Sequence, residues 1–153
     1  MAIKKYIKGN ILDASQKYIA HGVNCQNKMG SGVAKVLFNK YPEVKKMYHN
    51  YYNFMINQGY RNNLLGSIDL VECKGHNVFN CFTQNYYGYD GKKYVSYDAV
   101  YKCFVELKKR LHNKSIAIPK IGCGLAGGNW EIVSRIIDDA VGNNLDVYVY
   151  YLE

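Results

Sequence analysis

The chain has 153 residues, of which 48% are hydrophobic and 21% are charged. These proportions are typical of a soluble globular protein, and the length predicts a single domain over residues 1–153. No apolar run approaches the roughly 20 residues that a membrane span needs, and the first residues lack the apolar segment of a signal peptide. We therefore expect neither a membrane protein nor a secreted or disordered one.

The net charge is +8, from 20 Lys and Arg against 12 Asp and Glu. A basic surface attracts anionic partners, whether nucleic acid, nucleotide or phosphate. Because no arginine cluster or recognition motif accompanies the charge, we do not expect a nucleic-acid partner. The five cysteines are odd in number and suit a reduced, cytoplasmic protein. No credible cluster of metal ligands exists, so neither a metal nor another cofactor is expected.

The hydrophobic pattern predicts strands and helices that alternate along most of the chain. In chain order they are a strand at 2–7, a strand at 18–23, a helix at 33–38, a helix at 42–55, strands at 66–72 and 77–83 joined by a turn at 74–76, a helix at 96–111, a strand at 115–119, a helix at 130–141 and a strand at 145–152. This order predicts a three-layer α/β/α fold, with helices on both faces of a mixed, mostly parallel sheet.

Three glycine-bearing loops follow predicted strands, at residues 8–10, 28–32 and 121–128. The last two lead into helices, and a glycine-rich turn before a helix offers free backbone N–H groups to a phosphate. Two such loops favour a ligand whose diphosphate is held from both sides, although the glycines could also serve tight turns alone. Gly122-x-Gly124-x-x-Gly127 matches the dinucleotide fingerprint, but it lies too near the end of the chain for a Rossmann fold.

The segments 8–12, 20–34 and 118–130 resemble the macrodomain family, which binds ADP-ribose. The resemblance runs from about residue 5 to the end of the chain. It is closest to a small branch that contains ADP-ribose 1″-phosphate phosphatases, a protein glycohydrolase and an antitoxin that removes ADP-ribose from DNA.

The resemblance implies a pose for the ligand. Adenine would lie near Asn10, whose carbonyl would accept from the adenine amino group where the family usually has Asp. The diphosphate would lie between the loops at 30–33 and 121–126, and the distal ribose near Asn24. The implied ligand-binding residues are Gly9, Asn10, Ile11, Asn24, Lys28, Met29, Gly30, Ser31, Gly32, Val33, Thr83, Gln84, Pro119, Ile121, Gly122, Cys123, Gly124, Leu125, Ala126, Tyr150 and Leu152.

The resemblance also bears on the chemistry. Where the glycohydrolase branch has a lysine and an acid, this chain has Gln84 and Ala126, which counts against removal of ADP-ribose from protein or DNA by that route. His21, at the end of a buried strand, and Asp90 match residues of the yeast phosphatase. With Asn24 they form the predicted catalytic set, and an imidazole with a pKa near 6.5 suits acid or base work.

The sequence therefore predicts hydrolysis of ADP-ribose 1″-phosphate to ADP-ribose and phosphate by a monomeric protein. Two alternatives remain. The protein could be a module that binds ADP-ribose without turnover, or a hydrolase that removes ADP-ribose from protein or nucleic acid with a water held by Asn24, Gln84 or Asp90. The tyrosine-rich loop at 86–94 either covers the ribose or is simply exposed.

Overall fold

The computed structural model describes residues 1–152. Its elements, in chain order, are β1 (Ile3–Lys8), the 3-10 helix η1 (Ile11–Asp13), β2 (Tyr18–Asn24), α1 (Gly32–Lys40), α2 (Glu43–Asn57), the 3-10 helix η2 (Arg61–Asn63), β3 (Ile68–Glu72), β4 (Asn77–Gln84), α3 (Tyr97–Arg110), β5 (Lys114–Ile118), α4 (Trp130–Val141) and β6 (Leu145–Tyr151).

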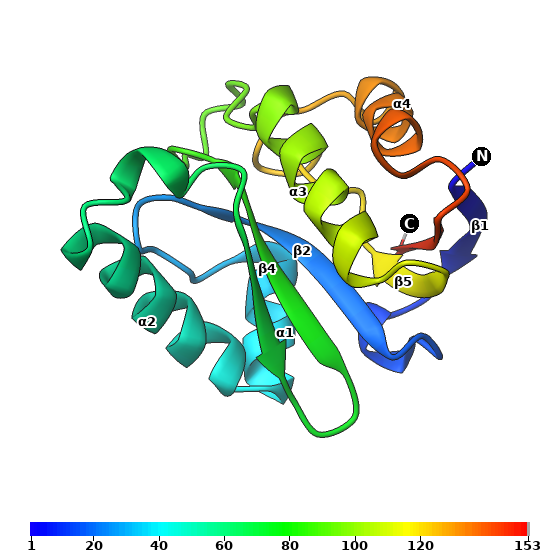
Figure 1. Cartoon of the computed structure of the whole chain (residues 1–153), viewed down its shortest axis with the longest axis horizontal. Helices are drawn as coiled ribbons and strands as arrows, with labels where there is room; N and C mark the ends of the chain where they lie inside the picture. Colours follow the sequence, from blue (N-terminus) through cyan, green and yellow to red (C-terminus); the bar gives the residue numbers. More distant parts are fainter. Residues whose placement is uncertain (153) are drawn as a thin grey trace.

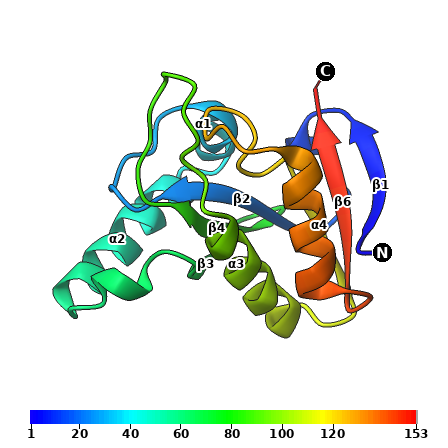
Figure 2. The ribbon, with the colours of Figure 1, turned by 90° about the horizontal axis from the view of Figure 1, so that it is seen from above.

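The six strands form one mixed sheet in the order β1-β6-β5-β2-β4-β3 (Figures 1 and 2). Every neighbouring pair is parallel except β3 and β4, which form an antiparallel hairpin. The predicted α/β class and the mostly parallel sheet are confirmed.

Two apolar cores lie on opposite faces of the sheet. One contains buried residues of α3 and α4, including Phe104 and Ile137. The other contains residues of α1 and α2, including Leu37 and Tyr48. The strand β2 contributes to both cores, which explains its near-continuous apolar sequence. The three-layer arrangement is therefore confirmed.

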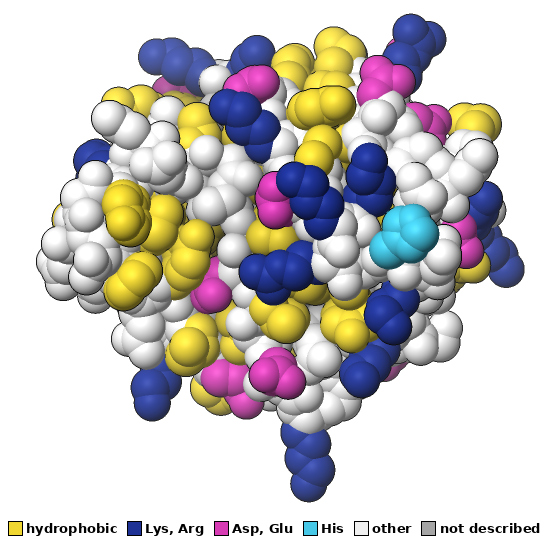
Figure 3. All heavy atoms as spheres, viewed as in Figure 1, with side chains coloured by type: hydrophobic (Ala, Val, Ile, Leu, Met, Phe, Trp, Pro, Cys, Tyr) yellow, Lys and Arg dark blue, Asp and Glu magenta, His cyan; other side chains and the backbone are white. Residues whose placement is uncertain are grey.

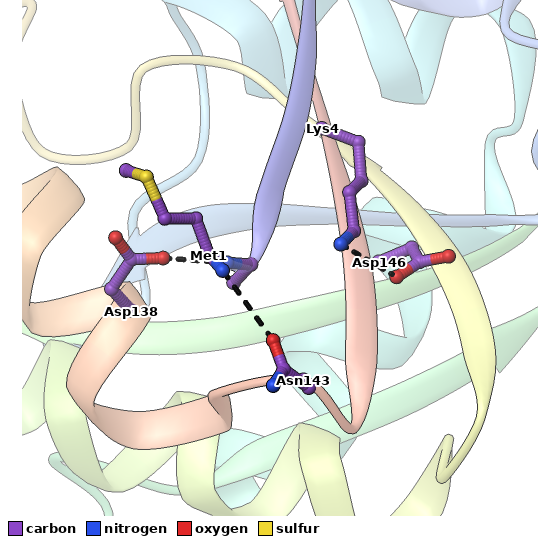
Figure 4. Close-up of polar contacts among 6 residues, drawn as sticks. Met1, Lys4, Asp138, Asn143 and Asp146 are labelled. Atoms are coloured by element: carbon purple, nitrogen blue, oxygen red, sulfur yellow. Dashed lines mark hydrogen bonds and ion pairs between the residues drawn. The ribbon is translucent and has the colours of Figure 1, made fainter.

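The first and last strands are neighbours, and the start of the chain is bound to the end of α4 (Figure 4). The backbone N–H of Ala2 donates to Asp138 Oδ1 at 2.6 Å, and the amino group of Met1 lies 3.4 Å from Asn143 Oδ1. Lys4 and Asp146 form an exposed ion pair between β1 and β6. These contacts fix β1 at the edge of the sheet.

The surface carries basic side chains that are interspersed with acidic and apolar ones on the face shown in Figure 3. None of the helices in residues 1–152 has the length and apolar character needed to cross a bilayer.

Candidate functional site

A cleft of about 450 Å³ opens at the carboxyl ends of β2, β4 and β5. Its walls come from these strand ends, the start of α1 and the loops that follow β4 and β5. In a largely parallel sheet this edge is the usual place for a ligand. The lining residues are His21, Gly22, Val23, Asn24, Lys28, Met29, Gly30, Ser31, Gly32, Val33, Ala34, Gln84, Tyr87, Gly88, Tyr89, Pro119, Lys120, Ile121, Gly122, Gly124, Leu125 and Ala126.

The start of α1 forms one wall of the cleft. Its N-cap residue, Ser31, makes no side-chain capping hydrogen bond. The N-cap residues of α3 and α4, Ser96 and Asn129, both accept a backbone N–H with their side chains. The first-turn N–H groups of α1 and the positive end of its dipole therefore face the cleft without a side-chain cap, which favours a bound anion. Lys28 and Lys120 add positive charge to the lining.

The glycines of the loops at 28–32 and 121–128 fall into two groups. Gly122 has a φ of 76°, and a Cβ there would lie 2.5 Å from a methyl carbon of Val95, so packing requires glycine. A Cβ added at Gly30 or Gly124 would meet nothing within 4 Å. Packing among the described residues gives no reason for glycine at these two positions. Both line the cleft, so a bare backbone leaves room there for a ligand.

Asn24 lines the cleft and also organises the loop that follows β2. Its Oδ1 accepts from the backbone N–H of Gln26 at 3.0 Å and lies 2.9 Å from the hydroxyl of Tyr48. Its Nδ2 donates to the carbonyl of Lys28 at 2.8 Å. Most of the hydrogen-bonding capacity of this amide therefore holds the loop, and one N–H of Nδ2 is left for a ligand.

His21 lies three residues before the end of β2, not at the end of the strand as expected from the sequence. The residue is 1% exposed, and its Nε2 donates to Asn80 Oδ1 at 2.5 Å. Because Asn80 donates its Nδ2 to the carbonyl of Val44, its oxygen faces the imidazole and Nδ1 of His21 is left without a partner. Burial lowers the pKa of His21 to about 4. The imidazole is therefore neutral at pH 7 and is not a general acid there.

Asp90 lies on the loop after β4 and is not among the cleft residues. Its Oδ1 accepts from the Tyr94 hydroxyl at 2.8 Å and from the backbone N–H of Lys92 at 3.2 Å. The first of these hydrogen bonds, helped by the second, holds the pKa of Asp90 below its ordinary value. The carboxylate is therefore ionised at neutral pH.

Several predicted ligand residues also lie outside the cleft lining. Asn10 caps η1, and Ile11 and Tyr150 belong to the same apolar core. Thr83 is fully buried beside Gly22, and its hydroxyl has no partner. The others are Gly9, Cys123 and Leu152.

The sequence left open whether the tyrosine-rich loop at 86–94 covers the ribose or is exposed, and the structure places its Tyr87 and Tyr89, which were not among the predicted site residues, in the cleft lining. The Tyr89 hydroxyl lies 3.3 Å from Ser31 Oγ, and the backbone N–H of Tyr87 donates to Gln26 Oε1 at 3.0 Å. The loop therefore contacts the opposite wall of the cleft. In the sequence, the tyrosines and glycines that directly follow a buried strand were the signal that could have indicated these cleft residues. The other missed residues are Gly22, Val23, Ala34, Gly88 and Lys120.

Within residues 1–152, no three His, Cys, Asp or Glu side chains come together in a way that could hold a metal ion.

Comparisons with known proteins agree on one family. The family model described as Macro domain matches residues 20–137. A phage T4 protein named "Uncharacterized 17.5 kDa protein in tk-vs intergenic region" is 36% identical, over 89% of this chain and 88% of its own. A protein of Debaryomyces hansenii named ADP-ribose 1″-phosphate phosphatase is 25% identical, over 97% of this chain and 99% of its own. A solved structure from Bacteroides thetaiotaomicron, of unknown function, has a TM-score of 0.82 at 30% identity and covers 98% of this chain and 99% of its own.

Proposed function

The chain belongs to the macrodomain family, and from that premise we propose that its cleft binds ADP-ribose and that the protein hydrolyses ADP-ribose 1″-phosphate to ADP-ribose and phosphate. The diphosphate lies between the start of α1 and the loop at 121–126 in this proposal. The distal ribose lies near Asn24, and the base lies toward Asn10.

One observation carries the binding half of the proposal. The start of α1, which has no side-chain cap, faces a glycine loop across the cleft, and both present backbone to the space between them. A diphosphate fits such a space because it accepts hydrogen bonds from backbone N–H groups on two sides. The basic side chains of Lys28 and Lys120 favour the same charge.

The catalytic half is supported by the names of yeast relatives that align over nearly their whole length. Hydrolysis needs a group that takes a proton from the attacking water. We assign this role to Asp90, because its carboxylate is ionised and its loop contacts the cleft wall. His21 is neutral, and its free Nδ1 is a second acceptor on the same strand as Asn24. The leaving oxygen takes its proton from solvent.

A second function, binding without turnover, is favoured by a specific observation. His21 is enclosed in the core beside Asn80, and Asp90 lies outside the cleft lining. His21 lines the cleft but is almost fully buried, and a module that only binds ADP-ribose needs no proton-transferring group at the ligand.

Binding is tested by calorimetry with ADP-ribose. We expect wild-type binding, and we expect Gly30→Val to weaken it at least tenfold, because the new side chain would enter space that the ligand needs. The melting temperature of Gly30→Val should stay close to that of the wild type, since nothing lies within 4 Å of the new Cβ. Asn53→Val, on the exposed surface of α2, is the control and should bind normally. Equal affinity in wild type and Gly30→Val would contradict this placement of the ligand.

Catalysis is tested by phosphate release from ADP-ribose 1″-phosphate. We expect Asp90→Asn to slow release about 100-fold, since an amide cannot take up the proton, while ADP-ribose affinity is retained. His21→Ala tests the second acceptor in the same way. Water labelled with oxygen-18 shows which bond breaks, because the label enters phosphate only if the P–O bond is cleaved. Binding of ADP-ribose without any release by the wild type would reject the phosphatase and leave the binding module.

A further inference from the structure

A second, smaller cavity of about 220 Å³ lies beside the cleft and shares none of its lining residues. The residues that line it are Cys25, Arg61, Asn62, Asn85 and Tyr86. Asn24 and Gln84 line the cleft, and the next residue of each segment lines the cavity. The backbone N–H of Cys25 donates to the carbonyls of Gln84 and Asn85, at 3.0 and 3.2 Å. Hydrogen-bonded backbone therefore separates the two hollows.

One wall of this cavity is the turn that carries Arg61 and Asn62. The turn is η2, which follows α2, and it leads directly into Leu64. Leu64 is 1% exposed and packs into the core beneath α1 and α2. Its backbone N–H donates to the carbonyl of Arg61 at 3.2 Å, and its own carbonyl accepts from the Ser67 hydroxyl at 2.6 Å. Buried packing therefore fixes the backbone that positions the arginine.

The opposite wall is the start of the loop after β4. Gln84 Nε2 donates to the carbonyl of Tyr86 at 2.7 Å, which holds the chain on either side of Asn85. Cys25, between the walls, is 5% exposed. Both walls therefore have fixed backbones, and the cavity exists before any ligand enters it.

The charge of the cavity lining is positive. No Asp or Glu is among its residues, and no carboxylate within residues 1–152 forms an ion pair with Arg61. Nη1 of Arg61 donates to the Tyr52 hydroxyl at 3.2 Å, and the guanidinium has further N–H donors. Burial raises the pKa of the Cys25 thiol, so this group is neutral at pH 7. The guanidinium charge is therefore unopposed by the lining.

Two amides add donors to this charge, one from each wall. The side chains of Asn62 and Asn85 make no hydrogen bond to any residue in 1–152. Each has an NH₂ group that can turn toward an anion. Donors from both walls therefore surround the cavity together with the guanidinium.

We propose that this cavity binds a phosphate group and is a site separate from the cleft. The planar guanidinium of Arg61 binds two phosphate oxygens side by side, and the amides of Asn62 and Asn85 donate to the others. A phosphate suits the lining because its oxygens point in several directions, toward both walls. The volume of about 220 Å³ holds a phosphate with several waters, since a water in the liquid takes about 30 Å³.

The test is an NMR titration with inorganic phosphate at constant ionic strength, which follows the side-chain amide signals of Asn62 and Asn85. We expect both signals to shift and to saturate in the millimolar range. Arg61→Gln should weaken this binding at least tenfold, because it removes the charge-assisted hydrogen bonds. Arg135→Gln is the matched control, since it removes the same charge from the exposed surface of α4 and should leave the titration unchanged. Shifts that never saturate, or equal shifts in wild type and Arg61→Gln, overturn the proposal.

A second variant tests the opposite wall while Arg61 stays in place. Asn85→Asp puts a carboxylate of the same size into the lining, where it repels phosphate and pairs with the guanidinium. It should also weaken binding at least tenfold, read from the amide signal of Asn62. Both Arg61 and Asn85 are exposed, so neither variant should lower the melting temperature. Normal phosphate binding by Asn85→Asp would show that the anion is not held between the two walls.

A titration with dimethyl phosphate identifies the source of the group. Saturating shifts with both compounds support the phosphodiester of a longer molecule, and shifts with inorganic phosphate alone support a free or terminal phosphate. Because the signals belong to residues of the cavity, these results do not depend on whether the cleft binds ADP-ribose.

Discussion

His21 is a buried imidazole whose protonation opposes folding. Its pKa is about 4 in the native state because burial disfavours the charged form, and about 6.5 in the unfolded chain. The native state therefore binds fewer protons between these values, and stability rises with pH across this range. The contribution is fully present above pH 6.5 and is lost as the pH falls from 6.5 to 4. This difference in pKa between the native and unfolded states corresponds to about 3 kcal/mol in the free energy of unfolding.

We expect this contribution to appear as a difference between wild type and His21→Leu. The free energy of unfolding, measured with urea from pH 4 to 7, should rise with pH by about 3 kcal/mol more in the wild type. Asp69, whose pKa burial raises to about 6, acts in the opposite direction but is present in both proteins and cancels. Stability curves that run parallel over this range would contradict the assignment.

For single residues, the sequence predicts which ones line the cleft better than it predicts their protonation and hydrogen bonds. Lys28 and Gly30 could be found because they lie on a glycine loop after a buried strand. Burial lowers the pKa of His21, and the hydrogen bond to Asn80 partly offsets this effect. Asn80 is 59 residues away and meets His21 only through the register of β2 and β4. The hydrogen bond from the Leu12 N–H to Asn10 Oδ1 depends on the local turn of η1, which the residue type alone does not specify.

Strands β2 and β4 approach closely where both reach the cleft. A Cβ added at Gly22 would lie 2.6 Å from Thr83 Oγ1 and 3.4 Å from a methyl carbon of Ile121. We expect Gly22→Ala to lower the free energy of unfolding by about 2 kcal/mol, as overpacking in a core does.

Thr83→Ala provides the matched test, because it removes the atom that the new methyl group would strike. Its own cost should be about 1 kcal/mol, from the lost buried methyl group, since the Thr83 hydroxyl has no hydrogen-bond partner to lose. In the double variant Gly22→Ala/Thr83→Ala, stability should recover by about 1 kcal/mol or more relative to the sum of the single variants. Simple additivity in urea unfolding would show that the two strands do not compete for this space.

The predicted elements match the structure because their boundaries have local causes. Gly59 follows α2 with a φ of 78°, and Ser96 caps α3 with its side chain. No local signal of this kind predicts that the loop at 85–94 lies against the cleft. Its position depends on single contacts of Tyr87 and Tyr89 with residues of other segments, and it lacks the apolar period that would reveal them.

For the whole molecule, alternation of strands and helices predicts parallel pairing and two helical layers, and the turn at 74–76 predicts the β3–β4 hairpin. The order β1-β6-β5-β2-β4-β3 does not follow from that pattern. Several strand orders bury the same apolar runs between helices, so the pattern alone does not choose among them. On the face shown in Figure 3, the basic side chains are spread among acidic and apolar ones.

The pairing of β1 with β6 has a consequence for how the protein is made. β1 has no other neighbour in the sheet, and its register joins Ile3 to Val147. During synthesis on the ribosome, residues 3–8 emerge early but have no strand to pair with until residues 145–151 follow. Closing so long a loop is slow relative to forming local contacts. The nascent chain therefore carries an unpaired strand until residues 145–151 have been made, and the exposed lysines of that strand help to protect it from pairing with another chain.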